Sequence, residues 1–324
     1  MIHCLESIMF DKQPVFVFNY DVMSIIPEFP NFKSVELQDR EFLHSILWRY
    51  KPRVSEYTFT NLFIWRSHYG FEWSVYKDRL LVTCRENGGD VCGIGPVGPP
   101  PRKDVTLVFL DWMRERNAQK GARIERADAM LVSELEGAGG VVCEPARDHF
   151  DYVYLREELV QLAGSRYRSK RNHINQVLRS YGLSYDYLQD RHIAECLELQ
   201  DKWCMEKRCE EDMDLLGEWE AVKEILVHFH DLKVYGGVIT IGGRVGAFTI
   251  GELLNPETAV VHIEKADPEI PGLYPVINRQ FCEKAWQNVT YINREQDLGI
   301  PGLRKAKLSY YPHHFVEKYS IRLI

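Results

Sequence analysis

The sequence lacks the features that define several common classes of protein. No apolar run approaches the ~18 residues needed to cross a membrane, and residues 1–23 lack the basic start and long apolar run of a signal peptide. The net charge is −7, whereas non-specific DNA binding requires a broad basic surface. These absences predict a cytoplasmic protein, free or at the inner face of the membrane, with no transmembrane segment and no affinity for DNA.

The eight cysteines are scattered, and none forms a C-x-x-C pair. Scattered cysteines in a long chain are typical of reduced thiols rather than of a disulfide framework. The nearest approach to a metal-ligand cluster is His192, Cys196, Cys204 and Cys209, whose later spacings match no zinc pattern. The sequence therefore predicts reduced cysteines and no metal site.

What is present is typical of a globular protein, with 45% hydrophobic and 27% charged residues, and a length of 324 residues suggests two domains. Two successive series of patterned segments share one order: a helix pair, a hairpin, a strand, a helix, a strand, a helix and a strand. This order matches the acyl-CoA N-acyltransferase (GNAT) architecture. We therefore predict an α/β fold of two tandem GNAT-like domains, residues 1–152 and 153–324, with mixed, mostly antiparallel sheets flanked by helices.

Two glycine-containing loops are candidates for phosphate binding. Gly93–Gly98 reads G-x-G-x-x-G, but Pro96 interrupts it and three prolines follow, so we interpret it as a loop leaving a strand rather than a dinucleotide site. In a GNAT fold the loop before Pro275 binds the pyrophosphate of coenzyme A, and here it offers only Gly272. Coenzyme A is therefore disfavoured as the donor, although the helix start could hold another anion.

Charged residues gather on two strands of the second half. Side chains alternate between the faces of a strand, so His262 and Glu264 share one face of their strand. Asn293 and Glu295 share one face of the other strand, and Arg294 points to the opposite face. If the two strands are neighbours, we expect Glu264, Asn293 and Glu295 to converge. The alternative is a set of solvated charges at strand ends.

A short helix follows, from about Pro301 to Tyr311, with Asp297 just before its start, where the helix dipole favours an anion. Tyr310 could protonate a leaving group or could simply pack.

A strongly basic segment, SRYRSKRNHIN, covers residues 165–175. On a helix, Tyr167, Arg171, Ile174 and Leu178 would form one stripe, which places Arg171 on the apolar side. Two interpretations remain open. The helix is solvated, with one inward arginine that meets a carboxylate, or it is a basic wall for a phosphate or an RNA backbone.

Three blocks, DYVYLREELVQLAGSRYRSKRNHIN, HIEKADPEIPGLYPVINRQF and YINREQDLGIPGLRKAKLSYYP, closely resemble the C-terminal domain of bacterial phosphatidylglycerol lysyltransferases. The resemblance is specific over about residues 150–315 and looser in the first half, mainly through SEYTFTNLFIWR. It implies a tandem GNAT fold and transfer of an aminoacyl group from aminoacyl-tRNA to a lipid head group. Characterised relatives carry a membrane-embedded region that this sequence does not contain, so the expected acceptor is an amine or hydroxyl group that need not belong to a lipid.

The resemblance also assigns roles to residues. The pattern NRE-x-D-x-G-x-x-G-L-R implies that Glu295 and Asp297 hold an amino group, while Arg304, Lys305 and Lys307 suit the acceptor end of a tRNA. We expect Glu264 or Glu295 to be the base and Tyr310 to be an acid, with no cofactor required. The expected substrate-binding residues are Asn293, Arg294, Asp297, Arg304, Lys305, Lys307, Arg171, Asn172, His173 and Asn278, with Gly272 at the anion loop.

Two alternatives belong to other functional classes. One is an N-acetyltransferase that uses acetyl-CoA, which binding of coenzyme A would support. The other is a non-catalytic module of the same fold that binds a small ligand or an RNA end. The sequence leaves the aminoacyl group, the acceptor and the oligomeric state open.

Overall fold

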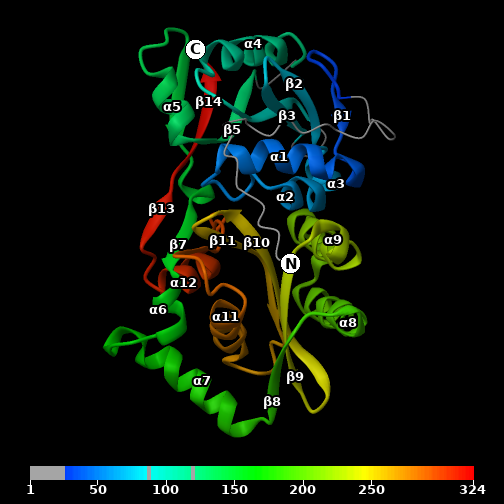
Figure 1. Cartoon of the computed structure of the whole chain (residues 1–324), viewed down its shortest axis with the longest axis vertical. Helices are drawn as coiled ribbons and strands as arrows, with labels where there is room; N and C mark the ends of the chain where they lie inside the picture. The colour runs from blue at the N-terminus through cyan, green and yellow to red at the C-terminus, as the bar shows by residue number, and fades with distance from the viewer. Residues whose placement is uncertain (1–25, 86–88, 118–120) are drawn as a thin grey trace, which may run out of the picture.

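The computed structural model describes residues 26–85, 89–117 and 121–324 as two stacked α/β halves (Figure 1). The segment 1–23, expected not to be a signal peptide, lies outside the described residues. No helix in the described ranges combines the length and the apolar character needed to cross a membrane.

The first sheet contains the strands of the N-terminal half together with the last strand of the chain. Its order is β1-β2-β3-β4-β5-β14-β6, and β4 and β5 are its parallel pair. The strands are β1 (Lys33–Ser34), β2 (Glu72–Tyr76), β3 (Arg79–Arg85), β4 (Val91–Val97), β5 (Arg123–Asp128), β6 (Val141–Pro145) and β14 (Lys318–Leu323). The helices of this half are α1 (Arg40–Tyr50), α2 (Phe59–Ile64), α3 (Arg66–Tyr69), α4 (Lys103–Arg114) and α5 (Ala129–Leu135).

The second sheet has the order β13-β7-β12-β11-β10-β9-β8, and β11 and β12 are its parallel pair. The strands are β7 (Asp151–Leu155), β8 (Leu183–Tyr187), β9 (Tyr235–Ile241), β10 (Arg244–Asn255), β11 (Thr258–Ala266), β12 (Tyr291–Asn293) and β13 (His314–Val316). The helices are α6 (Arg156–Gln161), α7 (Arg168–Ser180), α8 (Asp190–Lys207), α9 (Met213–Val227), α10 (Phe229–Leu232), α11 (Leu273–Lys284) and α12 (Pro301–Leu308). Helices α8 and α9 lie on one face of this sheet and α11 on the other (Figure 1).

The two halves exchange strands in a reciprocal way. β7 follows β6 in the chain but lies in the second sheet, between β12 and β13, and β14 follows β13 but lies in the first sheet, between β5 and β6. Because β14 pairs with β6 and β13 pairs with β7, the two crossing segments form one antiparallel ribbon that joins the sheets (Figure 1). The proposed boundary at 152/153 falls inside β7, within this ribbon.

The two halves also share a hydrophobic core. One buried cluster combines Leu43 and Phe63 of the first half with Val222, Phe248 and Ile263 of the second. Burial of such side chains stabilises by about 1.5–3 kcal/mol each, so this shared cluster and the ribbon hold the halves in one arrangement.

Each parallel strand pair separates after a short contact. β4 and β5 pair at Gly93–Ile124 and Ile94–Glu125, although β4 continues to Val97. β11 and β12 pair from Thr258 to Val260, although β11 continues to Ala266. We call the diverging ends the first fork, between β4 and β5, and the second fork, between β11 and β12. A divergence of this kind leaves room for side chains between neighbouring strands.

Local sequence signals fix the ends of several elements. Gly242 and Gly243 turn the β9–β10 hairpin with φ angles of +60° and +81°, which suit a two-residue turn with positive φ. Thr58 caps α2 by accepting a hydrogen bond from the Asn61 N–H at 3.1 Å. Pro301 lies in the first turn of α12, as predicted.

The G-x-G-x-x-G segment was interpreted as a loop, but it lies in the buried strand β4. Pro96, which cannot donate a ladder hydrogen bond, lies beyond the two pairs that join β4 to β5. The divergence of the strands therefore tolerates a proline inside a buried strand.

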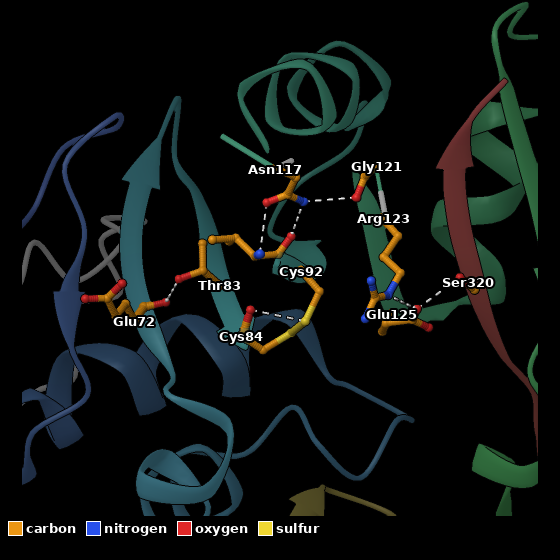
Figure 2. The surroundings of a disulfide bond; sticks show 10 residues. Glu72, Thr83, Cys84, Cys92, Asn117, Gly121, Arg123, Glu125 and Ser320 are labelled. Atoms are coloured by element: carbon orange, nitrogen blue, oxygen red, sulfur yellow. Dashed lines mark hydrogen bonds and ion pairs between the residues drawn. A yellow bond between two sulfur atoms is a disulfide. The ribbon is translucent and has the colours of Figure 1, made fainter. Parts of the chain in front are cut away.

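The prediction of reduced cysteines is wrong for two pairs. Cys84 and Cys92 face each other in the register of β3 and β4 and form a disulfide (Figure 2). A second disulfide joins Cys204 and Cys209 at the end of α8. Scattered spacing along the chain does not reveal such pairs, because register and helix ends set which thiols meet. The free thiols of the described residues are Cys143, Cys196 and Cys282, and Cys4 lies outside them.

Candidate functional site

The second fork holds a carboxylate between two donors from different elements. Glu264, near the end of β11, accepts hydrogen bonds from Arg294 Nη2 at 2.8 Å and from Asn278 Nδ2 at 2.9 Å. Arg294 follows β12, and Asn278 lies on the inward face of α11. Because β11 extends beyond its pairing with β12, the side chains of Glu264, Arg294 and Asn278 can meet between these strands and α11.

Two polar atoms of this cluster remain without a partner among the described residues. They are Arg294 Nη1, a donor, and Asn278 Oδ1, an acceptor, and both are buried. A buried polar atom without a hydrogen bond costs about 1–3 kcal/mol, so such atoms usually have a partner in the functional state. The Arg294 guanidinium also lies 4.8 Å from the ring centre of Tyr310. The cluster thus offers a donor and an acceptor without partners, on two residues that both bond to Glu264.

Two lysines near this cluster have unusual pKa values. Burial, together with the positive charge of Arg294, lowers the pKa of Lys170 and that of Lys307 to about 8. Lys170 Nζ donates to Ser309 Oγ at 2.7 Å and lies 3.5 Å from the ring centre of Tyr310. Lys307 Nζ donates to the main-chain carbonyls of Arg294 and Glu295. Lys170 is therefore the lysine whose nitrogen is less occupied by other groups.

Tyr310 is buried, and burial raises the pKa of its phenol. A phenol with a raised pKa keeps its proton and is a weaker acid than an exposed tyrosine. Tyr310 can therefore position a group by its ring and hydroxyl, but the environment does not help it to release a proton.

A second chain of ionisable groups lies on the side of the sheet that faces α2. His262 contacts Glu295 through Nδ1 at 2.9 Å and Glu252 through Nε2 at 3.0 Å. Burial alone would lower the pKa of His262, but the two carboxylates outweigh burial and raise the pKa to about 9. Glu295 also accepts from Asn61 of α2 at 3.4 Å. This buried carboxylate–imidazolium–carboxylate chain links the second sheet to the first half.

The expected convergence of Glu264, Asn293 and Glu295 is wrong. Glu264 bonds to α11 and Arg294, whereas Glu295 bonds to His262 and α2, and the described residues show no hydrogen bond between the two carboxylates. The side chains of β11 do not alternate strictly between the two faces, because His262 has no partner in the register with β10. Ile250 pairs with Ile263, and the next residue, Gly251, pairs with Val261. A β-bulge shifts the facing pattern of all residues beyond it.

Asn293 belongs to the contact between the halves. Its Nδ2 donates to Asp151 at 3.0 Å and to the Arg53 carbonyl at 3.3 Å, and the residue is fully buried.

Asp297 and Arg304 pair with each other. The Arg304 guanidinium donates to both carboxylate oxygens of Asp297 at 2.8 Å, and Tyr152 and the Gly299 N–H donate as well. Burial would raise the pKa of Asp297, but these donors outweigh it and hold the pKa below its usual range. Several donors therefore already occupy the carboxylate. Lys305, the third expected contact on this helix, is exposed.

The basic segment forms α7, and its inward stripe differs from the expected one. Ile174 and Val177 are buried, whereas Leu178 is 45% exposed. Arg171 meets carbonyl groups rather than a carboxylate, because its Nη1 donates to the Leu162 and Gly164 oxygens at the end of α6. The expected contact residues Asn172 and His173 are exposed.

Gly272 caps α11 with a φ of +95°, and α7 packs directly against it. A Cβ added to Gly272 would lie 3.1 Å from the His173 carbonyl oxygen and 3.2 Å from Val177 Cγ2. The loop that holds a pyrophosphate in GNAT enzymes is thus in contact with a helix in this chain.

Sequence reasoning missed the ionic cluster where the ribbon crosses between the sheets. Lys318 Nζ lies 2.6 Å from Asp151 Oδ1 and also donates to Glu56 and Ser55, and the Lys318 and Asp151 side chains are fully buried. The sequence offers only a weak signal, a lysine at an alternating position in the final apolar strand. The partners come from positions far apart in the chain, so no local pattern shows them.

The first fork contains an arginine whose donors are all in use. Arg102 donates to Glu134 Oε1 from Nε at 2.8 Å and also from Nη2, and its Nη1 donates to the Tyr50 hydroxyl and the Pro96 carbonyl. Tyr57 fills the rest of this fork, since a Cβ on Gly95 would lie 2.7 Å from the Tyr57 hydroxyl. The first fork is closed by its own side chains.

Each of the two sheets has a central pair of parallel strands that separate, and helices flank the sheets. This arrangement defines a tandem GNAT-like fold, as predicted. The chain belongs to the family of phosphatidylglycerol lysyltransferase C-terminal domains, whose sequence model matches residues 48–322. Family and fold point to an acyltransferase.

Three solved structures show how similar the chain is to known proteins. A conserved protein of unknown function from Bacteroides thetaiotaomicron is 33% identical, with a TM-score of 0.83, over 90% of this chain and 99% of that one. L-PGS from Bacillus licheniformis is 14% identical, with a TM-score of 0.62, over 92% and 93% of the two chains. FemX is 10% identical, with a TM-score of 0.52, over 91% and 97%. The last two show similarity of fold alone.

Proposed function

We propose that this protein transfers an aminoacyl group from aminoacyl-tRNA to an amine or hydroxyl acceptor, and that the second fork is its active site. The observation that supports this most is the pair of unpartnered buried atoms, Arg294 Nη1 and Asn278 Oδ1, on either side of Glu264. An aminoacyl ester carries a protonated amino group and a carbonyl oxygen. The amino group suits Asn278 and Glu264, and the carbonyl oxygen suits Arg294.

The ester donor already contains the activated bond, so the protein contributes position and charge. The acceptor nitrogen or oxygen attacks the ester carbonyl carbon, and the C–O bond to the terminal ribose breaks. Arg294 Nη1 stabilises the negative charge that develops on the carbonyl oxygen, a contribution of about 2.7–4 kcal/mol for one well-placed donor. The acceptor loses one proton, and the departing ribose oxygen gains one.

Lys170 is the proton acceptor in this scheme. With a pKa of about 8, an appreciable fraction of Lys170 is neutral near pH 7.5, and a neutral amine can accept the proton of the nucleophile. Lys170 adjoins Tyr310, whose ring contacts both Lys170 and Arg294. Glu264 serves as the binding group for the amino group, because two donors already hold its oxygens.

Coenzyme A is less favoured as the donor. Helix α7 contacts Gly272 at the start of α11, where the pyrophosphate of coenzyme A would have to approach. The nature of the acceptor is not fixed by the fork, and both lipid head groups and small amines meet its chemical requirement.

The test is a transfer assay with purified protein, a set of charged tRNAs, and amine, hydroxyl and phosphatidylglycerol acceptors. We expect ester-dependent transfer in the wild type and a loss of at least about 100-fold in Glu264→Gln. The matched control is Glu220→Gln, an exposed position on α9. Equal activity in both variants would refute the site, and stabilisation of the protein by coenzyme A with transfer from acetyl-CoA would refute the donor.

A further inference from the structure

Helix α7 carries a stripe of five polar side chains on its outer face. They are Arg168, Asn172, Asn175, Gln176 and Arg179. At 100° per residue these positions fall within about 100° of arc, and the eleven helical steps from Arg168 to Arg179 span about 16 Å. All five are exposed, while Ile174 and Val177 bury the opposite face. The helix therefore presents a flat row of amides with a cation at each end.

The surface of this stripe is hollowed and strongly biased in charge. A shallow depression of about 340 Å³ is lined by Asn172, Asn175, Gln176, Arg179 and Ser180. Residues 159–185 contain five arginines and lysines and no acidic residue, although the whole chain has a net charge of −7. The cationic side chains around α7, with no carboxylate in this segment, give a local positive potential on a protein that is acidic as a whole. Such a surface suits a polyanion.

The geometry points to an RNA backbone as the partner, and we propose that the amide–arginine stripe of α7 binds the phosphodiester backbone of the donor tRNA. Arginine pairs with phosphate, and side-chain amides can both donate to phosphate oxygens and exchange hydrogen bonds with ribose 2′-hydroxyls. An anionic membrane would instead favour a stripe with apolar side chains, whereas the exposed Leu178 of this helix lies outside the arc of the five polar residues. This inference rests on the proposed function and names how the same donor is held.

The position of α7 connects the stripe to the second fork. On its inward side, Lys170 reaches Ser309 and Tyr310 beside Arg294, while the five residues of the stripe are exposed. Helix α7 itself lies at the lower edge of the molecule (Figure 1). A tRNA bound along α7 would therefore lie on the far side of the same helix that helps to line the fork. Arg171 takes no part, since it caps the end of α6.

Charge reversal of both arginines tests the proposal, with a matched control of equal charge change. The variant is Arg168→Glu/Arg179→Glu, and the control is Arg49→Glu/Arg114→Glu, two exposed arginines on α1 and α4 of the first half. Uncharged full-length tRNA binding is measured by fluorescence anisotropy across a salt series. Loss of two phosphate contacts should weaken binding by at least about 10-fold and reduce the slope of log K against log salt by about 1.4–1.8. Equal tRNA affinity in variant and control overturns the proposal.

A second readout separates this proposal from the proposed function. Transfer is measured from full-length aminoacyl-tRNA and from a short aminoacylated oligonucleotide that ends in the same acceptor sequence. The charge-reversed variant should show a KM raised at least about 10-fold for the full tRNA and an unchanged KM for the short donor. If the wild type uses neither donor, the proposed function fails, while the binding experiment still judges the stripe. If the variant instead loses binding to phosphatidylglycerol vesicles and keeps its tRNA affinity, the surface is for lipid and the RNA assignment is wrong.

Discussion

The two forks of this molecule occupy equivalent places in their sheets but differ in how they use an arginine. In the first fork, every guanidinium nitrogen of Arg102 donates a hydrogen bond, to Glu134, Tyr50 or the Pro96 carbonyl. In the second, Arg294 pairs with Glu264 and leaves Nη1 buried without a partner among the described residues. The same fold therefore yields one fork whose arginine is fully satisfied and one whose arginine keeps a buried donor without a partner among the described residues. The difference lies in whether the buried donors are satisfied within the protein.

The largest expected effect concerns the ribbon that both halves share. Lys318→Ala leaves Asp151 buried without its cation and removes one of the two cations beside Glu56, so we expect the free energy of unfolding to fall by about 3–5 kcal/mol. Urea denaturation followed by fluorescence measures the change. The exposed Lys305→Ala should change the same quantity by no more than about 0.5 kcal/mol. Similar stabilities for the two variants would show that the crossing cluster does not hold the halves together.

Exchanging arginine for lysine in each fork sharpens the comparison. Arg294→Lys keeps the charge and removes the free Nη1, so we expect transfer to fall by about 100-fold with little change in the melting temperature. Arg102→Lys loses hydrogen bonds to buried partners, so we expect about 1–3 kcal/mol of destabilisation and normal transfer by the folded fraction. The reverse outcome, with a catalytic loss at Arg102, would assign the active site to the first fork.

The pH dependence of transfer reports on Lys170. Its pKa of about 8 means that the neutral form increases as the pH rises, so the transfer rate should climb through about pH 8 and then level off. Lys170→Arg keeps a positive charge over this range and should remove the rise, whereas the exposed Lys305→Arg should keep it. A pH profile that is the same in all three proteins would exclude Lys170 as the proton acceptor.

The stability of the protein should also change with pH through His262. Its pKa is about 9 in the folded protein and near 6.5 when unfolded, so its contribution is full below pH 6.5 and is lost as the pH rises through 9. The difference in unfolding free energy between the wild type and His262→Gln should therefore shrink by about 3 kcal/mol between pH 6 and pH 10. His149, whose pKa is lowered mainly by burial, provides a contrast, because its contribution is present at high pH and is lost as the pH falls. A wild-type-minus-variant difference independent of pH would contradict the charged His262.

Local pattern was enough to predict the general order of helices and strands and the helix that Pro301 opens. Features that depend on distant parts of the chain could not be predicted. The exchange of β7 and β14 depends on which sheet each strand joins, and the carboxylate partners of Lys318, Glu56 and Asp151, lie more than 150 residues away. No local sequence pattern indicates the strand exchange or the partners of Lys318.

For the candidate site, the sequence pointed to charged residues around β11 and β12 but did not give their arrangement. The bulge at His262 separates Glu264 from Glu295, and a single extra residue in a strand has no clear sequence signature. Lys170 was missed because its importance arises from burial beside Tyr310 and Arg294, which only the packing of α7 creates.

A crystal structure with a non-hydrolysable aminoacyl-adenosine amide tests the central claim most directly. We expect the amino group of the analogue to lie within hydrogen-bond distance of Asn278 Oδ1 and Glu264, and its carbonyl oxygen to accept a hydrogen bond from Arg294 Nη1. Density for the analogue in the first fork, or a second fork that stays empty when a solution assay shows the analogue bound, would contradict the account.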